Sequence, residues 1–367
     1  MKNKSPLALL PLLLATTVLH AAEPSPQLSH FISDTLVHSP EADASGDEVR
    51  AWDNWALSFD NDILLPGSRD RDYTYGISLT LSGAGARNSW YSPYRALAWL
   101  DRGVGVDGKS ANDIERVTLE TGVIAFTPDD IETAQALEGE RPYSSLLYLS
   151  SVRQQVDLEN NTAWNSSFTV GILGLPLVGS LQNQLHDLLG GDRANGWNNQ
   201  ISDGGELTAR YAVARQQNWN LNSNNLEVKT TVQGSVGYLS EASWSINLRA
   251  GDIHSPWWSF NPQLASYGQQ SSEIAVSAQS ERYFWAGAAV KARAYNALLQ
   301  GQFRDSAVSY GSGEVEHLLL EAWAGYTLTF DGGYRVSYMV RGQSSELKQG
   351  EGDRNLLWGG VTFSKTF

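Results

Sequence analysis

The chain contains no cysteine, although it is 367 residues long. This absence excludes disulfide bonds and cysteine-based zinc sites, so an exported protein of this size would depend on its backbone hydrogen bonds for stability. Cations are also scarce, because 26 Lys and Arg stand against 40 Asp and Glu, which gives a formal net charge of −14. Such a surface argues against nucleic acid as a partner and favours divalent cations.

Long apolar runs are missing from most of the chain. Residues 6–19 form an apolar run that follows Lys2 and Lys4 and is too short to span a bilayer. With Ala21 and Ala22 as a cleavage point, residues 1–21 are expected to be a secretory signal peptide. No other stretch approaches 18 apolar residues, so the sequence predicts no transmembrane helix. Residues 22–50 have little periodicity and predict a loose periplasmic extension.

Alternation of apolar and polar residues dominates the rest of the chain. In the final segment, Leu357, Val361, Phe363 and Phe367 alternate with small polar residues, and the sequence stops at the phenylalanine. Outer-membrane β-barrels of Gram-negative bacteria end in this way, with one strand face toward lipid and the other toward a wet lumen. Aromatic residues make up 10% of the chain, which suits girdles at the two membrane interfaces.

The alternation predicts that residues 51–367 form one all-β domain, a transmembrane antiparallel β-barrel of about 12 strands. The expected strands are 54–62, 72–82, 115–126, 143–154, 164–174, 205–215, 226–239, 243–252, 283–295, 315–329, 333–344 and 355–367. If both ends of the barrel face the periplasm, the connections at 63–71, 127–142, 175–204 and 296–314 are extracellular. The link at 253–282 is then periplasmic, although it is much longer than the usual periplasmic turn.

One extracellular connection has a helical pattern. In the sequence SLQNQLHDLLGG, Gln182 and His186 are four residues apart and would share one face of a short helix near 180–190. The other face would be apolar and would pack the helix over the barrel mouth; it comprises Leu181, Leu185, Leu188 and Leu189. A single loop histidine is more often a solvated residue than a catalytic one, so this segment alone does not define a site.

A second segment, FDNDILLPGSRDRDYTYG, closes the first strand and opens the second. The strand order brings Asn61, Asp62 and Thr74 to the same rim as His186. By strand parity Asp62 and Thr74 would face the lumen, whereas Asn61 would face outward unless the strand end is bulged. Clustered Asp and Asn oxygens suit a hard cation such as Ca²⁺, although similar clusters also occur in ordinary turns.

These residues carry a family resemblance. The FDND and DRDYTYG pair, the TPDDI and ERPYSSLLY segment, QNQLH followed by GW and NQ, and YNALLQG together resemble the outer-membrane lipid A 3′-O-deacylase family over about residues 52–367. The resemblance implies a Ca²⁺-dependent hydrolase of the outer membrane, with its site facing the outer leaflet. Its substrate would be lipid A of lipopolysaccharide, cleaved at the ester of the 3′-acyloxyacyl chain.

The motifs also imply roles for five residues. His186 would be the general base that activates water, and Asp62 with help from Asn61 would hold Ca²⁺, which stabilises the oxyanion. Thr74 and Gln182 would position the water, the base or the substrate. No serine nucleophile is required, and the sequence contains neither a GxSxG nor an HEXXH motif.

One position departs from the family pattern. The resemblance implies a functional lysine in the loop after the third strand, but residues 127–140 contain no Lys or Arg, and Arg141 is the nearest cation. Arg69, Arg71 and Arg193, on the expected outer side, could supply the charge; otherwise the substrate or the cleaved acyl position differs.

Two further functions stay open at the level of sequence. The first is a passive pore, whose narrow lumen Arg249, Arg335 and Arg341 would largely fill. The second is an outer-membrane phospholipase with a serine–histidine pair and Ca²⁺, for which the sequence lacks a clear histidine-then-serine strand motif. In each case the protein is expected to act as a monomer among outer-membrane lipids.

Overall fold

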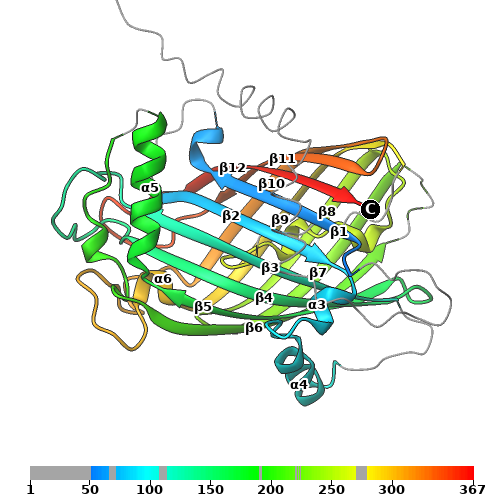
Figure 1. Ribbon diagram of the computed structural model, residues 1–367, viewed down its shortest axis with the longest axis horizontal. Helices are drawn as coiled ribbons and strands as arrows, with labels where there is room; N and C mark the ends of the chain where they lie inside the picture. Colours follow the sequence, from blue (N-terminus) through cyan, green and yellow to red (C-terminus); the bar gives the residue numbers. More distant parts are fainter. Residues whose placement is uncertain are drawn as a thin grey trace, which may run out of the picture.

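The protein is a closed antiparallel barrel of twelve strands, in which each strand pairs with its sequence neighbours and β1 pairs with β12 (Figure 1). The computed structural model describes residues 51–65, 72–106, 114–189, 192–219, 221, 223, 225–269 and 279–367. The all-β barrel and its strand number are thus confirmed. The signal peptide and the extension predicted for residues 1–50 lie outside the described residues.

The strand bounds follow the alternation in the sequence closely. The strands are β1 (Asn54–Asn61), β2 (Asp72–Ser82), β3 (Ile114–Thr127), β4 (Ser144–Asp157), β5 (Thr162–Leu173), β6 (Glu206–Trp219), β7 (Leu226–Gly237), β8 (Leu239–Asp252), β9 (Glu281–Asn296), β10 (Leu318–Phe330), β11 (Tyr334–Gln343) and β12 (Leu356–Thr366). Both ends of the barrel lie together, because Asn54 pairs with Thr366. By the usual topology of outer-membrane barrels this end is periplasmic, and the opposite end is extracellular.

The helices are short. They are α3 (Ala84–Asn88), α4 (Tyr94–Val104), α5 (Pro176–Leu189) and α6 (Ala297–Gln300), with 3₁₀ turns η2 (Asp62–Leu64), η3 (Trp197–Asn199), η4 (Trp257–Ser259) and η5 (Pro262–Leu264). Among the described residues, none of these helices has the length and apolar character needed to cross a membrane. The helix predicted near 180–190 is confirmed as α5, whereas α3 and α4 were not predicted.

The barrel wall separates an apolar outer face from a charged lumen. Leu57, Val232 and Trp244 are exposed on the outer face. Inside, Arg335 pairs with Glu281, and Arg341 Nη1 lies 2.6 Å from Glu321 Oε1. Pairing of this kind is required, because an isolated charge in a closed lumen would carry a desolvation penalty of several kcal/mol.

The long link after β8 enters the lumen as a plug, and its prediction as a periplasmic loop was wrong for residues 255–269. Phe260 packs against Tyr283 and Trp285, with ring centroids 5.5 and 5.1 Å apart. Lys229 Nζ donates to Asn261 Oδ1 at 2.7 Å, and Tyr238 Oη donates to the Tyr267 carbonyl at 2.8 Å. The length of the link is therefore explained by its path into the barrel. Residues 270–278 lie outside the described residues.

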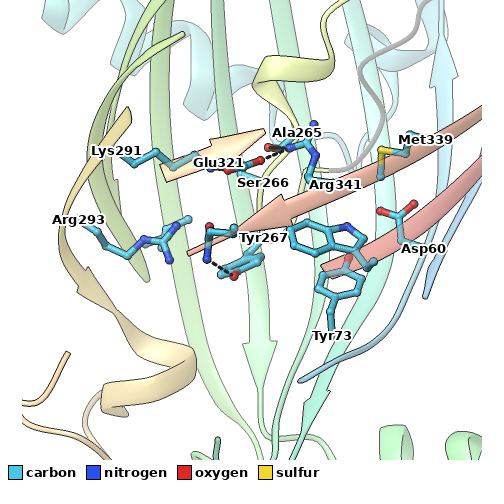
Figure 2. A pocket seen from close by; sticks show the side chains of 13 residues that line it. Asp60, Tyr73, Ala265, Ser266, Tyr267, Lys291, Arg293, Glu321, Met339 and Arg341 are labelled. Carbon is cyan, nitrogen blue, oxygen red and sulfur yellow. Dashed lines mark hydrogen bonds and ion pairs between the residues drawn. The ribbon is translucent and has the colours of Figure 1, made fainter. Parts of the chain in front are cut away.

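The plug leaves little free volume. Figure 2 shows Tyr267 and Ala265 of the plug among side chains of the barrel wall. Lys291 and Arg293 lie on one side of Tyr267, and Asp60 and Tyr73 lie on the other. Arg341 Nη1 donates to the Ala265 carbonyl at 3.2 Å. The space that remains among the lining residues is about 30 Å³, which is room for about one water molecule.

This packing predicts a closed channel. In planar bilayers the unaltered protein should give no steady open-channel current, because the plug is bonded to the wall along its length. A variant whose residues 256–264 are replaced by a Gly-Ser segment of equal length should conduct, provided that it still migrates as a heat-modifiable barrel on gels. Steady current through the unaltered protein would contradict the plug and revive the passive-pore hypothesis.

Candidate functional site

The site begins where β1 ends. Asn61, the last residue of β1, accepts a hydrogen bond from the Ile63 amide at 2.6 Å through Oδ1 and so caps η2. Its Nδ2 donates to the Thr74 carbonyl and ties the end of β1 to the start of β2. Asp62 follows as the first residue of η2 and is buried. Because Asp62 lies in this turn and not in the strand, strand parity does not determine where it faces.

A β-bulge at Thr74 changes the faces of β2. Tyr73 pairs with Phe126 and Tyr75 with Ala125, so Thr74 is an extra residue in β2. Its hydroxyl lies 2.7 Å from that of Thr127, which alternates with the inward-facing Phe126 and so has outward parity. The prediction that Thr74 faces the lumen was therefore wrong, and Thr74 shares the outer wall with Asn61.

The same bulge separates two tyrosines that simple alternation would place on one face. Tyr73 stacks on Trp358 inside the barrel, with ring centroids 5.0 Å apart. Tyr75 belongs to the outer wall, where its hydroxyl donates to the Val178 carbonyl of α5 at 3.1 Å. Helix α5 thus lies against the outside of the barrel. The tyrosine that contacts it is the residue directly after Thr74.

This position corrects the predicted packing of α5. We expected its leucine face to cover the barrel mouth, but Leu181, the member of that face whose side chain is described, is 45% exposed. Leu177, one turn earlier, is 59% exposed. The face toward the wall carries Val178 and Gln182, both buried. In Figure 1, α5 crosses the outside of the barrel near the extracellular strand ends. The helix therefore presents leucines to the lipid side and polar residues to the wall.

Gln182 is held by a tryptophan from the following loop. Trp197 Nε1 donates to Gln182 Oε1 at 2.7 Å, while Gln182 Nε2 is buried and has no hydrogen-bond partner among the described residues. The indole lies flat on α5 because Gly179 has no side chain, and a Cβ at that position would meet the ring at 2.5 Å. Trp197 belongs to the GW pair of the sequence motif, but the motif alone did not reveal this positioning role.

His186 lies on α5 one turn after Gln182. The helical backbone from Pro176 to Leu189 places positions 182 and 186 on the same face, as the spacing predicted. The side chain of His186 lies outside the described residues, as do those of Leu185, Leu188 and Leu189. Asn61 and Thr74 contact each other at the outer wall. Gln182 lies on the buried face of α5, which Tyr75 joins to the same wall, and position 186 follows one turn later on that face.

Two extracellular loops fix the surroundings of α5. Asn195 Nδ2 and Asn199 Nδ2 donate to the Glu132 and Ala134 carbonyls at 2.9 and 2.8 Å, which joins the loop after β3 to the loop after α5. At the head of the first loop, hydrogen bonds from the Thr133 hydroxyl and amide lower the pKa of Asp130. The acidic side chains of this loop are therefore ordered by local turns.

The cations near this loop have separate positions. Arg141 is buried and turns into the lumen, where its Nη1 lies 2.6 Å from Glu346 Oε2. Burial raises the pKa of Glu346, but the guanidinium groups of Arg141 and Arg293 outweigh it and hold that pKa below its usual value. Arg193 is exposed, with its Nε 3.8 Å from Asp187 Oδ1. Arg69 and Arg71 lie outside the described residues.

The donors near the end of β1 match a hard cation in kind. They include the buried Asp62 carboxylate, the Asn61 amide oxygen and the Thr74 hydroxyl, and oxygen ligands of these types are those that Ca²⁺ takes in proteins. In the part of the chain that the structure describes, no group of three or more His, Cys, Asp or Glu residues could hold a metal ion. A metal here would thus depend on mixed side-chain, backbone and substrate oxygens.

A family model and one solved structure relate this chain to known proteins. A model of the family described as outer membrane protein LpxR matches residues 14–367. The solved structure of LpxR from Salmonella typhimurium is similar, with a TM-score of 0.65 and 16% identity over 86% of this chain and 100% of that one. The β domain of the Bordetella autotransporter BrkA aligns at a TM-score of 0.42 and 9% identity, over 87% of this chain and 100% of that one. A search of curated proteins found no match.

The Trp197 contact generates a prediction for Gly179→Ala. The added Cβ would push the indole away from α5 and so release Gln182 Oε1, at a cost of about 1–3 kcal/mol in local stability. Hydrogen exchange at residues 176–184 and 194–200 should become faster. Gly103→Ala in α4 is the matched control, because a Cβ there meets nothing within 4 Å. Equal exchange in the two variants would show that the indole does not hold the helix.

Proposed function

The chain belongs to the outer membrane protein LpxR family, and we propose that it is a lipid A deacylase of the Gram-negative outer membrane. The proposed reaction is hydrolysis of the ester that holds the 3′-acyloxyacyl chain of lipid A. Water adds to the ester carbonyl, the C–O bond breaks, and the products are a free acyloxyacyl acid and a 3′-hydroxyl on the remaining lipid.

The position of polar groups on the outer wall is the main structural support for this proposal. The outward position of Asn61 and the bulge at Thr74 put their polar groups on the outer wall, beside a helix whose Leu177 and Leu181 face away from the barrel. This wall faces lipid, and the ester of a lipid in the outer leaflet can approach it sideways from the membrane. A substrate in the lumen would instead meet the plug, so this arrangement favours an amphiphilic substrate over a soluble one.

We propose His186 as the general base. A neutral imidazole can take a proton from water near neutral pH, which the attack on an ester requires. Its place on α5 after Gln182 gives it the same wall-facing side. Gln182, anchored through Oε1 to Trp197, keeps its Nε2 available to orient water or the substrate carbonyl. Thr74 would position water or substrate through its hydroxyl.

We propose Ca²⁺ as the cofactor, held by Asp62 with help from Asn61. When bound, Ca²⁺ would polarise the ester carbonyl and stabilise the oxyanion. Asn61 already accepts from Ile63 through Oδ1, but a carbonyl oxygen has a second lone pair for a ligand contact. Arg193, exposed beside α5, could supply the phosphate-recognition charge that the loop 127–140 lacks.

His186→Ala should abolish the activity. Lipid A from cells that express the unaltered protein should lose one acyloxyacyl group by mass spectrometry, and the variant should reduce this conversion by about 100-fold or more, as expected for a lost general base. His254→Ala on the periplasmic side is the control and should retain the conversion. Both barrels should remain heat-modifiable on gels.

Unchanged deacylation by His186→Ala would remove the proposed base. Release of fatty acid from glycerophospholipid, but not from lipid A, would instead support the phospholipase hypothesis.

Chelation should test the cofactor. Ethylene glycol tetraacetic acid should stop deacylation in isolated membranes, and added Ca²⁺ should restore it. Asp62→Asn should raise the Ca²⁺ concentration for half-maximal activity by about tenfold or more, because a ligand charge is lost. Full activity of Asp62→Asn at unchanged Ca²⁺ concentrations would rule out Asp62 as a ligand.

A further inference from the structure

Helix α4 lies on the outside of the barrel at the end opposite to α5 (Figure 1). Its Asp101 is fully buried against the wall, where Ser166 Oγ and Tyr211 Oη donate to it at 2.8 and 3.0 Å, and Arg153 Nη1 lies 3.3 Å away. These three partners have outward parity on β5, β6 and β4. Helix α4 is therefore fixed to the lipid-facing surface of the wall.

The contacts also set the depth of α4. Arg153 is four residues from the periplasmic end of β4, and Ser166 is four residues from the periplasmic start of β5. At about 3.3 Å per residue along a tilted strand, this is close to the boundary between headgroups and acyl chains. A second contact joins the start of α4 to β3: Tyr94 Oη donates a hydrogen bond to Glu115 Oε1 at 3.2 Å.

At two positions α4 differs from a typical helix on the surface of a soluble protein. Its charged Asp101 faces the protein, whereas Trp99 is 67% exposed and Trp90, just before the helix, is 92% exposed. In water such large exposed indoles would be unfavourable, but indoles favour the headgroup region of a membrane. The lipid belt of the barrel continues directly onto this face.

Two arginines flank the exposed tryptophan on the same face. Arg95, Trp99 and Arg102 are spaced by four and three residues, which places them in one stripe, and both arginines are exposed. Among the described residues, the guanidinium group of neither arginine forms an ion pair or a hydrogen bond, although the Arg102 carbonyl accepts from the Gly105 amide at 3.3 Å. A cation, an indole and a second cation match the phosphate and glycerol region of a phospholipid.

We propose that α4 is a binding site for phospholipid of the periplasmic leaflet, with Arg95 and Arg102 on the headgroup phosphate and Trp99 at the acyl boundary. The occupant is a glycerophospholipid, because this end of the barrel meets the phospholipid leaflet and not the lipopolysaccharide leaflet. Lipid bound at this site holds the barrel at a fixed depth in the membrane. It acts at the periplasmic end, whereas the proposed active site lies near the extracellular end.

Spin labelling tests the location. The chain has no cysteine, so Ala96→Cys on the exposed face can carry a single nitroxide. In phosphatidylglycerol–phosphatidylcholine vesicles this label should be relaxed more by oxygen than by nickel ethylenediamine diacetate, whereas a label at Ser312→Cys in an extracellular loop should show the opposite. Equal behaviour of the two labels would overturn the membrane position of α4.

Native mass spectrometry tests the phosphate contact. The barrel that carries both Arg95→Gln and Arg102→Gln should retain about one fifth, or less, of the phosphatidylglycerol that the unaltered protein retains. The double Lys variant should retain most of it, and Arg304→Gln in an extracellular loop should change nothing. Equal lipid retention by the Gln variant, with its barrel still heat-modifiable, would overturn the proposal.

Discussion

Closure of the hydrogen-bond ladder is the constraint on which this molecule depends. A bilayer offers no water to unpaired backbone groups, so every strand needs two partners, and the pairing of β1 with β12 supplies the last of them. With the ladder closed, the side chains alone decide what faces lipid and what faces the lumen. The charged interior is then stable only because its members pair, as Arg335 does with Glu281 and Arg341 with Glu321.

A single extra residue in this ladder creates the candidate site. Without the bulge at Thr74, the polar groups at the start of β2 would follow strict alternation and enter the lumen, where the plug leaves no room. With it, Thr74 joins Asn61 on the outer wall, beside Tyr75, which contacts α5. Bulges often redirect side chains beside functional sites, and here the redirection is from the lumen to the lipid side.

The sequence predicted the barrel well and the site in part. Period-two alternation is repeated over twelve strands, so the bounds of the strands could be read to within a few residues. The sequence could not predict which side of the barrel wall Thr74 and Tyr73 face. A bulge depends on the pairing with β3 and leaves no signal in the local pattern. The leucine face of α5 was expected to be buried because in water it would be, whereas Leu181 of that face is exposed on the lipid side. The plug was missed for a related reason, since its bonds to the wall come from residues far away in the chain, such as Lys229 and Arg341.

The position of the plug between β8 and β9 also constrains how the protein can be assembled. Residues 253–269 are joined at one end to β8 and contact residues of strands on several sides of the lumen, including β7 and β11. Once β1 and β12 have paired, the closed wall offers the segment no lateral entry, and only the periplasmic end of the barrel, where β8 ends and β9 begins, leads into the lumen. Topology therefore limits the plug to two routes: sideways before the seam closes, or through the periplasmic end afterwards.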